Sequence, residues 1–239
     1  MKPLSECRLY AFVDSAYLDG RSPTLIAQQL CDGGADLIQL RAKQLPANEI
    51  RLWAEQILPV TTKANVGLVI NDHLEIAAEV GAPWCHLGQE DFFDAGYTQV
   101  SELFARPVMK GAGLEDAAQD CVPAQENLHA SPRPEVRVGL STHAPEQALR
   151  AVAAGAQYVA IGPVFATGTK PTAKPVTLEY VRWAAASIDL PWFAIGGINL
   201  SNLDQVLSAG ARRICVVSAI LNAPDVQKAC REFRERLPD

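Results

Sequence analysis

Long apolar runs are missing from this chain of 239 residues. No uninterrupted apolar stretch approaches the roughly 18 residues that a membrane-spanning helix needs, so we expect no membrane partner. The N-terminal segment, Met1 to Arg8, lacks the basic-then-apolar order of a secretory signal peptide. A cytoplasmic protein is therefore the default expectation.

An excess of positive charge is also missing. The formal net charge is −6, and nucleic acids are bound by clustered Lys and Arg, so we expect no nucleic-acid partner. The six cysteines form no C-x-x-C pair. This disfavours a zinc site or a disulfide framework and favours small buried thiols in a reducing compartment. The 49% of apolar residues is enough for one globular domain with a substantial core.

A Gly-Ala pair followed by a short apolar run occurs four times. Each copy follows a segment with helical apolar spacing, so the Gly is typical of the left-handed residue that ends a helix. The apolar run after it is typical of a strand buried on both faces of a parallel sheet. The four copies span residues 34–40, 81–87, 155–161 and 210–216.

Four further runs also have the composition of strands: 9–13, 67–70, 136–140 and 192–195. Helical segments are expected between most strands, at about 22–33, 46–64, 73–80, 144–154, 176–188 and 199–209, and a last helix at about 225–236. Ser22-Pro23 and Asn199 are suitable helix starts. Eight alternating strand–helix units predict a single-domain (β/α)₈ barrel, an α/β fold, over the competing doubly wound open sheet.

Residues 92–134 do not follow this alternation of strands and helices. The segment has one weak helical stretch, near 98–105, and its second half is rich in Ala, Pro, Gln and Asn. We interpret it as an insertion or lid above the barrel.

Charged side chains gather at the predicted strand ends, where barrel enzymes hold their active sites. Asp72 and Asp91 follow adjacent strands, and Arg41, Lys43 and Lys170 are expected at the same mouth. Carboxylates among cations suit a magnesium ion with a polyphosphate, since Mg²⁺ takes one or two carboxylates plus phosphate oxygens. Arg and Lys both bind phosphate. Ion pairs between barrel loops are the alternative.

A second cluster, Gly196-Gly197 and Ser218, follows the seventh and eighth predicted strands. This is a common monophosphate site in barrels, where glycines let backbone N–H groups approach the anion. A tight corner is the alternative. Thr167 and Thr169 offer hydroxyl donors nearby. We interpret His86 as a satisfied core histidine, and His143 lies closer to the mouth.

Seven motifs, in this order, resemble the thiamine-phosphate synthase family over about residues 8–222. They are QLRAK (39–43), ND (71–72), HLGQED (86–91), GLSTH (139–143), GPVFATGTK (162–170), AIGGI (194–198) and VVSAI (216–220). The resemblance implies a transferase that joins hydroxymethylpyrimidine diphosphate to thiazole phosphate. Diphosphate leaves the pyrimidine methylene, and the thiazole nitrogen attacks that carbon.

The resemblance also implies a role for each matching residue. Gln39, Arg41, Lys43, Asn71 and Lys170 bind the pyrimidine diphosphate, and Ser141 contacts the pyrimidine. Asp72 and Asp91 hold Mg²⁺. Thr167, Thr169, Gly197, Val217 and Ser218 bind the thiazole phosphate, with Gly196 beside them. Arg41, Lys43, Ser141 and Lys170 are the expected catalytic residues.

The chain departs from the family pattern in two places. The stretch from Asp91 to Ser141 is longer than usual, and Gly168 stands where Pro is common. Three rival functions remain: a thiazole tautomerase-like isomerase, a non-catalytic thiamine-intermediate binder and a sugar-phosphate isomerase. None of them needs Lys43, Asp72 and Asp91 together. The sequence leaves open whether the chain forms a homo-oligomer.

Overall fold

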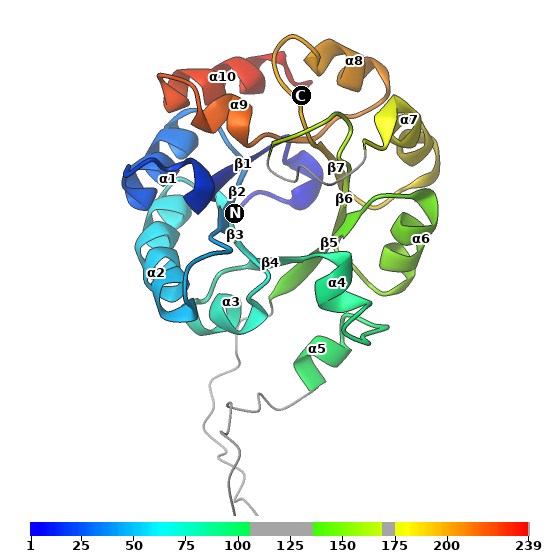
Figure 1. Ribbon diagram of the computed structural model, residues 1–239, viewed down its shortest axis with the longest axis horizontal. Helices are drawn as coiled ribbons and strands as arrows, with labels where there is room; N and C mark the ends of the chain where they lie inside the picture. The colour runs from blue at the N-terminus through cyan, green and yellow to red at the C-terminus, as the bar shows by residue number, and fades with distance from the viewer. Residues whose placement is uncertain (106–135, 169–174, 239) are drawn as a thin grey trace, which may run out of the picture.

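A computed structural model describes residues 1–105, 136–168 and 175–238. Eight parallel strands close into one barrel in chain order, which confirms the predicted (β/α)₈ barrel and excludes an open sheet (Figure 1). The strands are β1 (Leu9–Asp14), β2 (Leu37–Arg41), β3 (Gly67–Asn71), β4 (Trp84–Leu87), β5 (Arg137–Thr142), β6 (Tyr158–Ile161), β7 (Trp192–Ile195) and β8 (Ile214–Cys215).

Ten helices accompany the strands, and most of them form a ring around the barrel in the part of the chain that the structure describes (Figure 1). They are α1 (Pro23–Asp32), α2 (Ala47–Lys63), α3 (Leu74–Val80), α4 (Gln89–Phe92), α5 (Glu102–Ala105), α6 (Pro145–Ala153), α7 (Thr177–Ser187), α8 (Leu203–Ser208), α9 (Ser218–Leu221) and α10 (Val226–Arg236). Two 3₁₀ turns, η1 (Leu4–Glu6) and η2 (Ser15–Tyr17), flank β1. Within the described ranges, no helix is both long and apolar enough to cross a bilayer.

Most helix positions agree with the sequence, and three details differ. The sequence did not predict α4 and α9, each of which is a single turn. The predicted helix start at Asn199 is wrong, because α8 begins at Leu203. The Asn199 side chain instead accepts hydrogen bonds from the N–H groups of Ser201 and Asn202, and so stabilises a turn ahead of the helix.

The four repeated glycines all have the left-handed backbone that the sequence predicts. Their φ angles are +87° at Gly34, +77° at Gly81, +86° at Gly155 and +101° at Gly210. This conformation is costly for a residue with a Cβ and free of that cost for Gly. Each Gly thus turns the chain from a helix into the next strand.

Aromatic rings fill the inside of the barrel. The Tyr10 ring contacts Phe12, Tyr158 and Phe193, with centroid separations of 5.3, 6.1 and 5.4 Å. Trp84 meets Tyr158 edge to face at 5.8 Å. Because these rings are buried and mutually packed, they form a rigid base beneath the strand ends.

The N-terminal segment covers the end of the barrel at which the strands begin. Lys2 forms an ion pair of 2.6 Å with Asp36, and the indole of Trp84 donates to the sulfur of Met1 at 3.2 Å. The Asp36 carboxylate also accepts from the N–H groups of Arg8 and Leu9. The carboxyl ends of the strands are therefore the open face.

The described start of the predicted insertion lies at the side of the barrel. The N–H of Val100 donates to the carbonyl of Ala154 at 2.8 Å, and the Arg150 guanidinium lies 3.8 Å from the Phe93 ring centroid. Helix α5 lies outside the helix ring (Figure 1). Residues 106–134 lie outside the described residues, so the lid stays a prediction.

Candidate active site

A pocket opens at the carboxyl ends of the strands, with about 980 Å³ of space including the part open to solvent. Every described residue that the sequence proposed for the site lines it. These are Gln39, Arg41, Lys43, Asn71, Asp72, Asp91, Ser141, Thr167, Gly196, Gly197, Val217 and Ser218. The other two proposed residues, Thr169 and Lys170, lie outside the described residues.

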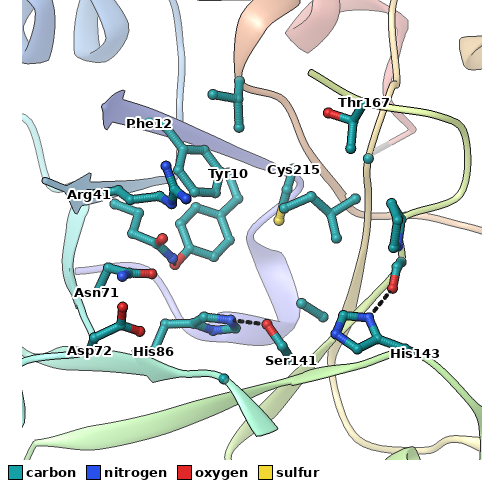
Figure 2. A pocket seen from close by; sticks show the side chains of 18 of the residues that line it. Tyr10, Phe12, Arg41, Asn71, Asp72, His86, Ser141, His143, Thr167 and Cys215 are labelled. Carbon is teal, nitrogen blue, oxygen red and sulfur yellow. Dashed lines mark hydrogen bonds between the residues drawn. The ribbon is translucent and has the colours of Figure 1, made fainter. Parts of the chain in front are cut away.

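Side chains of different chemistry occupy different parts of this pocket (Figure 2). Arg41, Asn71 and Asp72 lie along one side, and Thr167 lies across from them. His86 and Ser141 lie between the two sides, beneath the space that Tyr10 and Phe12 border. The charged end thus lies across the pocket from Thr167, as a pocket for two ligands requires.

Arg41, at the end of β2, is held by a carboxylate from the neighbouring strand. Its Nη1 donates to Oδ2 of Asp14 at 2.8 Å, and the two side chains are only 14% and 1% exposed. The other carboxylate oxygen of Asp14 accepts from the N–H of Ala16 at 3.0 Å. Because a guanidinium has five N–H donors, Arg41 keeps donors for a ligand while Asp14 fixes its position.

Lys43 and Asp72 form an ion pair at the mouth, with Nζ 3.1 Å from Oδ2. Asp72 directly follows β3 and has φ of +64°, a left-handed conformation that costs a non-glycine residue about 1 kcal/mol. Its N–H donates to the His86 carbonyl on β4 at 2.9 Å, which holds this conformation. The barrel thereby fixes the Asp72 carboxylate at the pocket.

Asp91 lies in α4, whose N-terminal turn it stabilises by accepting the Gly88 N–H at 3.2 Å. Burial and the negative charge of Asp72 raise the pKa of Asp91 above its ordinary value of 3.8, with Lys43 acting in the opposite direction. Two carboxylates that interact in this way favour a cation between them.

The described residues contain no group of three or more His, Cys, Asp or Glu side chains placed to hold a metal. Asp72 and Asp91 are therefore a two-carboxylate set at most. Such a set fits magnesium, which commonly takes one or two carboxylates and completes its shell with phosphate oxygens and water. It fits zinc poorly, because structural and catalytic zinc sites use three or four protein ligands.

The Gly196-Gly197 corner follows β7 with φ angles of +103° and +64°. A Cβ at Gly196 would lie 2.3 Å from Cβ of Pro163, and one at Gly197 would lie 2.5 Å from the Ala166 carbonyl. The left-handed backbone angles and the lack of room for a Cβ thus both require glycine at these two positions. Both glycines pack closely on the loop after β6, and Ser218, the first residue of α9, lines the same pocket as Thr167 of that loop.

Ser141 and Gln39 reach the pocket from the barrel interior. Oγ of Ser141 lies 2.9 Å from Nε2 of His86, and the Ser141 carbonyl accepts from the Gln89 amide at 2.6 Å. His86 is 7% exposed and hydrogen-bonded through both ring nitrogens, as expected for a satisfied core histidine, yet it also borders the pocket. His143 lines the pocket too, with its Nδ1 against the Gly162 carbonyl.

Sequence reasoning overlooked Asp14, Tyr10 and Phe12, which line or support the site. Asp14 ends β1 just as Arg41 ends β2. Its place at the carboxyl end of the first strand is the sequence signal that marks it as a site residue. Tyr10 and Phe12 resemble ordinary core aromatics in sequence, and only closure of the barrel shows that they face the ligand space.

Comparison with known proteins points to one family. A family model described as thiamine monophosphate synthase matches residues 9–131 and 118–220. The thiamine-phosphate synthase of Thermus thermophilus is 43% identical over 206 residues, which cover 86% of this chain and 84% of that protein. The thiamine-phosphate synthase of Acidothermus cellulolyticus is 38% identical over 98% of this chain and 96% of that protein.

A solved structure agrees with this. Thiamine phosphate pyrophosphorylase from Pyrococcus furiosus superimposes with a TM-score of 0.76 at 28% identity, covering 97% of this chain and 96% of that one. The structure of 3-hexulose-6-phosphate synthase, at 18% identity and a TM-score of 0.58, shares the fold alone.

Proposed function

The chain belongs to the thiamine monophosphate synthase family and its activity is that of a thiamine-phosphate synthase, and from this premise we propose how its pocket performs the reaction. Its substrates are hydroxymethylpyrimidine diphosphate and thiazole phosphate, and its products are thiamine phosphate and diphosphate. The observation that carries the proposal is the placement of Arg41, Lys43, Asp72 and Asp91 around one pocket.

Asp72 and Asp91 are the residues that would hold Mg²⁺. When bound, the ion supplies positive charge that stabilises the departing diphosphate. The repulsion between the two carboxylates and their proximity to Lys43 support this assignment. Once a cation neutralises Asp72, the Lys43 ammonium is available to a phosphate oxygen.

Arg41 and Lys43 bind the diphosphate. Asp14 fixes the Arg41 guanidinium before substrate arrives, so little reorganisation is needed when negative charge develops on the leaving group. Lys170, which we also assign to the diphosphate, lies outside the described residues. Asn71 is 9% exposed at the end of β3 and offers an amide to the same substrate.

The thiazole phosphate binds at the Gly196-Gly197 corner and the start of α9. Within residues 1–105, 136–168 and 175–238, the N–H groups of Gly197 and Ser218 donate no hydrogen bond. Backbone N–H groups at such positions bind phosphate in many barrels. Thr167 borders the same space, and Thr169, Val217 and Gly196 complete the proposed set.

The reaction is a dissociative displacement at the pyrimidine methylene. The bond between this carbon and the diphosphate oxygen breaks, and its electron pair leaves with the diphosphate. The aminopyrimidine delocalises the positive charge that remains. The lone pair of the thiazole nitrogen then forms the new carbon–nitrogen bond, so no proton has to be removed and no general base is needed. Holding both substrates together supplies much of the acceleration.

One assay tests this proposal against the tautomerase-like isomerase. Purified protein should release diphosphate only when Mg²⁺ and both substrates are present. Asp91→Asn should abolish this release while leaving the affinity for thiazole phosphate nearly unchanged, since Asp91 lies at the diphosphate end. Diphosphate release by Asp91→Asn at the wild-type rate would remove the metal role. Turnover that needs neither diphosphate nor metal would indicate the isomerase.

We also propose a cytoplasmic location. The five cysteines in the described part of the chain, Cys7, Cys31, Cys85, Cys215 and Cys230, are free thiols, which suits a reducing compartment. The single-domain assignment and a role for residues 92–134 as a lid stay predictions.

A further inference from the structure

Hydrogen bonds through the barrel interior link Gln39, which we expect to bind the pyrimidine diphosphate, to Ser141, which we expect to contact its pyrimidine. Nε2 of Gln39 donates to the Tyr10 hydroxyl at 2.6 Å. The hydroxyls of Tyr10 and Tyr158 lie 3.1 Å apart, and that of Tyr158 lies 3.0 Å from Nδ1 of His86. Nε2 of His86 then meets Oγ of Ser141 at 2.9 Å. We call Tyr10, Tyr158 and His86 the connecting triad.

The connecting triad is buried and closely packed. Its members are 1%, 0% and 7% exposed, and the His86 ring stacks on Tyr158 with centroids 5.6 Å apart. A Cβ at Gly139 would lie 2.0 Å from the Tyr158 ring, so the ring fits only because residue 139 is glycine. Since Gly139 lies two residues before Ser141 on β5, the strand that carries Ser141 also determines where Tyr158 packs.

The position of each hydrogen in this series of hydrogen bonds can be assigned in order. Tyr10 accepts from Gln39, so its own hydrogen goes to the other oxygen beside it, the Tyr158 hydroxyl. Tyr158 must then donate to Nδ1 of His86. A neutral imidazole that accepts at Nδ1 carries its proton on Nε2, and this N–H donates to Ser141. The hydroxyl hydrogen of Ser141 is left to point into the pocket.

Both phenols keep the hydrogens that this order requires. Burial raises the pKa of Tyr10 and of Tyr158 well above 10, so both remain neutral across the range in which enzymes work. An ionised phenol has no hydrogen to donate and could only accept hydrogen bonds, which would reverse this order of donors and acceptors.

We infer that Tyr10, Tyr158 and His86 are positioning residues of the pyrimidine subsite, which hold Gln39 and Ser141 in place and make Ser141 a hydrogen-bond donor to the substrate. The ligand atom opposite Ser141 is then an acceptor, as an aromatic ring nitrogen is. The part of this inference that names the pyrimidine rests on the proposed function. The order of the hydrogens rests on the contact geometry of the connecting triad, with both phenols neutral.

The order of hydrogens is tested on the protein without substrate. The chain has four histidines, so ¹⁵N-labelled histidine resonances can be assigned by single replacements. We expect His86 to be the Nε2–H tautomer in the wild type, and to lose this preference in Tyr158→Phe, which removes the donor to Nδ1. An Nδ1–H tautomer in the wild type would overturn the inference, whatever the enzyme's activity.

The positioning role is tested by steady-state kinetics of Tyr158→Phe. We expect kcat/KM for the pyrimidine diphosphate to fall about five- to ten-fold, the effect of one lost neutral hydrogen bond, while the KM for thiazole phosphate stays unchanged. Tyr180→Phe is the matched control. This variant removes the hydroxyl of a buried tyrosine that is only 5% exposed. That hydroxyl donates to the Thr142 hydroxyl and to the Ala144 carbonyl, and neither residue lines the pocket.

Equal effects of the two variants on both substrates would show that Tyr158 acts only through stability, and would overturn the positioning role. A wild type that releases no diphosphate would instead count against the proposed function. In that case the tautomer measurement still decides the order of the hydrogens.

Discussion

The carboxylate of Asp14 and the guanidinium of Arg41 meet at 2.8 Å where β1 and β2 end side by side. Each group satisfies the other in a part of the barrel that water hardly reaches. This pair explains how one cation of the site is held ready while its remaining donors face the pocket.

Asp14→Asn should weaken both the fold and the binding of diphosphate. The variant leaves a mostly buried cation without its counter-charge, and we expect a loss of about 1–3 kcal/mol, less than for a fully buried pair because Arg41 is 14% exposed. The KM for the pyrimidine diphosphate should rise because Arg41 is no longer fixed. Denaturant unfolding and steady-state kinetics measure the two effects. Glu79→Gln, which breaks the exposed Arg51–Glu79 pair, should cost under about 1 kcal/mol and leave KM unchanged.

Asp91→Asn should stabilise the metal-free protein at neutral pH. Burial and Asp72 raise the pKa of Asp91, so the folded state binds this proton more tightly than the unfolded chain does. The ionised Asp91 carboxylate therefore lowers the free energy of unfolding at pH values above the raised pKa. This loss disappears as the pH falls to 3.8, the ordinary pKa of an aspartate. Thermal unfolding against pH should show a higher Tm for Asp91→Asn near pH 7 and equal values near pH 4.

Magnesium should reverse this difference, because it binds the ionised carboxylate and stabilises the folded wild type. Asp189→Asn, which changes an exposed carboxylate on another part of the barrel, is the control and should respond to neither pH nor Mg²⁺ in this way. A wild-type Tm that is unaffected by Mg²⁺, with or without diphosphate, would contradict the assignment of Asp91.

Gly139→Ala should disturb the fold and the pyrimidine subsite together. Its Cβ would lie 2.0 Å from the Tyr158 ring, so the ring must move, at an expected cost of about 1–3 kcal/mol. The movement should also lower kcat/KM for the pyrimidine diphosphate. For comparison, among the described residues a Cβ at Gly168 would approach nothing closer than the Tyr17 hydroxyl at 3.9 Å. Gly168→Ala should therefore leave the free energy of unfolding unchanged, and an equal loss in both variants would be inconsistent with this explanation.

The sequence predicts the barrel well because its signals are local. The left-handed glycines at 34, 81, 155 and 210 mark the helix ends, and apolar runs mark the buried strands. The charged site is also predictable, since parallel strands bring their carboxyl ends to one mouth. By contrast, the link from Gln39 to Ser141 joins residues 102 positions apart through side chains that look like core packing. Only three-dimensional register reveals such contacts, and α4 and α9 were overlooked because a single turn has no periodicity to detect.

Gly197→Ala should act mainly on the thiazole phosphate. At φ of +64°, with a Cβ 2.5 Å from the Ala166 carbonyl, the variant combines backbone strain with a clash and must shift the corner that we assign to the phosphate. We expect the KM for thiazole phosphate to rise at least ten-fold, with a smaller change for the pyrimidine diphosphate. Gly81→Ala is the matched control, because its φ of +77° carries the same strain and no atom of the described residues lies within 4 Å of the added Cβ. It should lose about 1 kcal/mol of stability and keep both KM values. If Gly197→Ala changed only the free energy of unfolding, as Gly81→Ala should, the corner would not be the phosphate site.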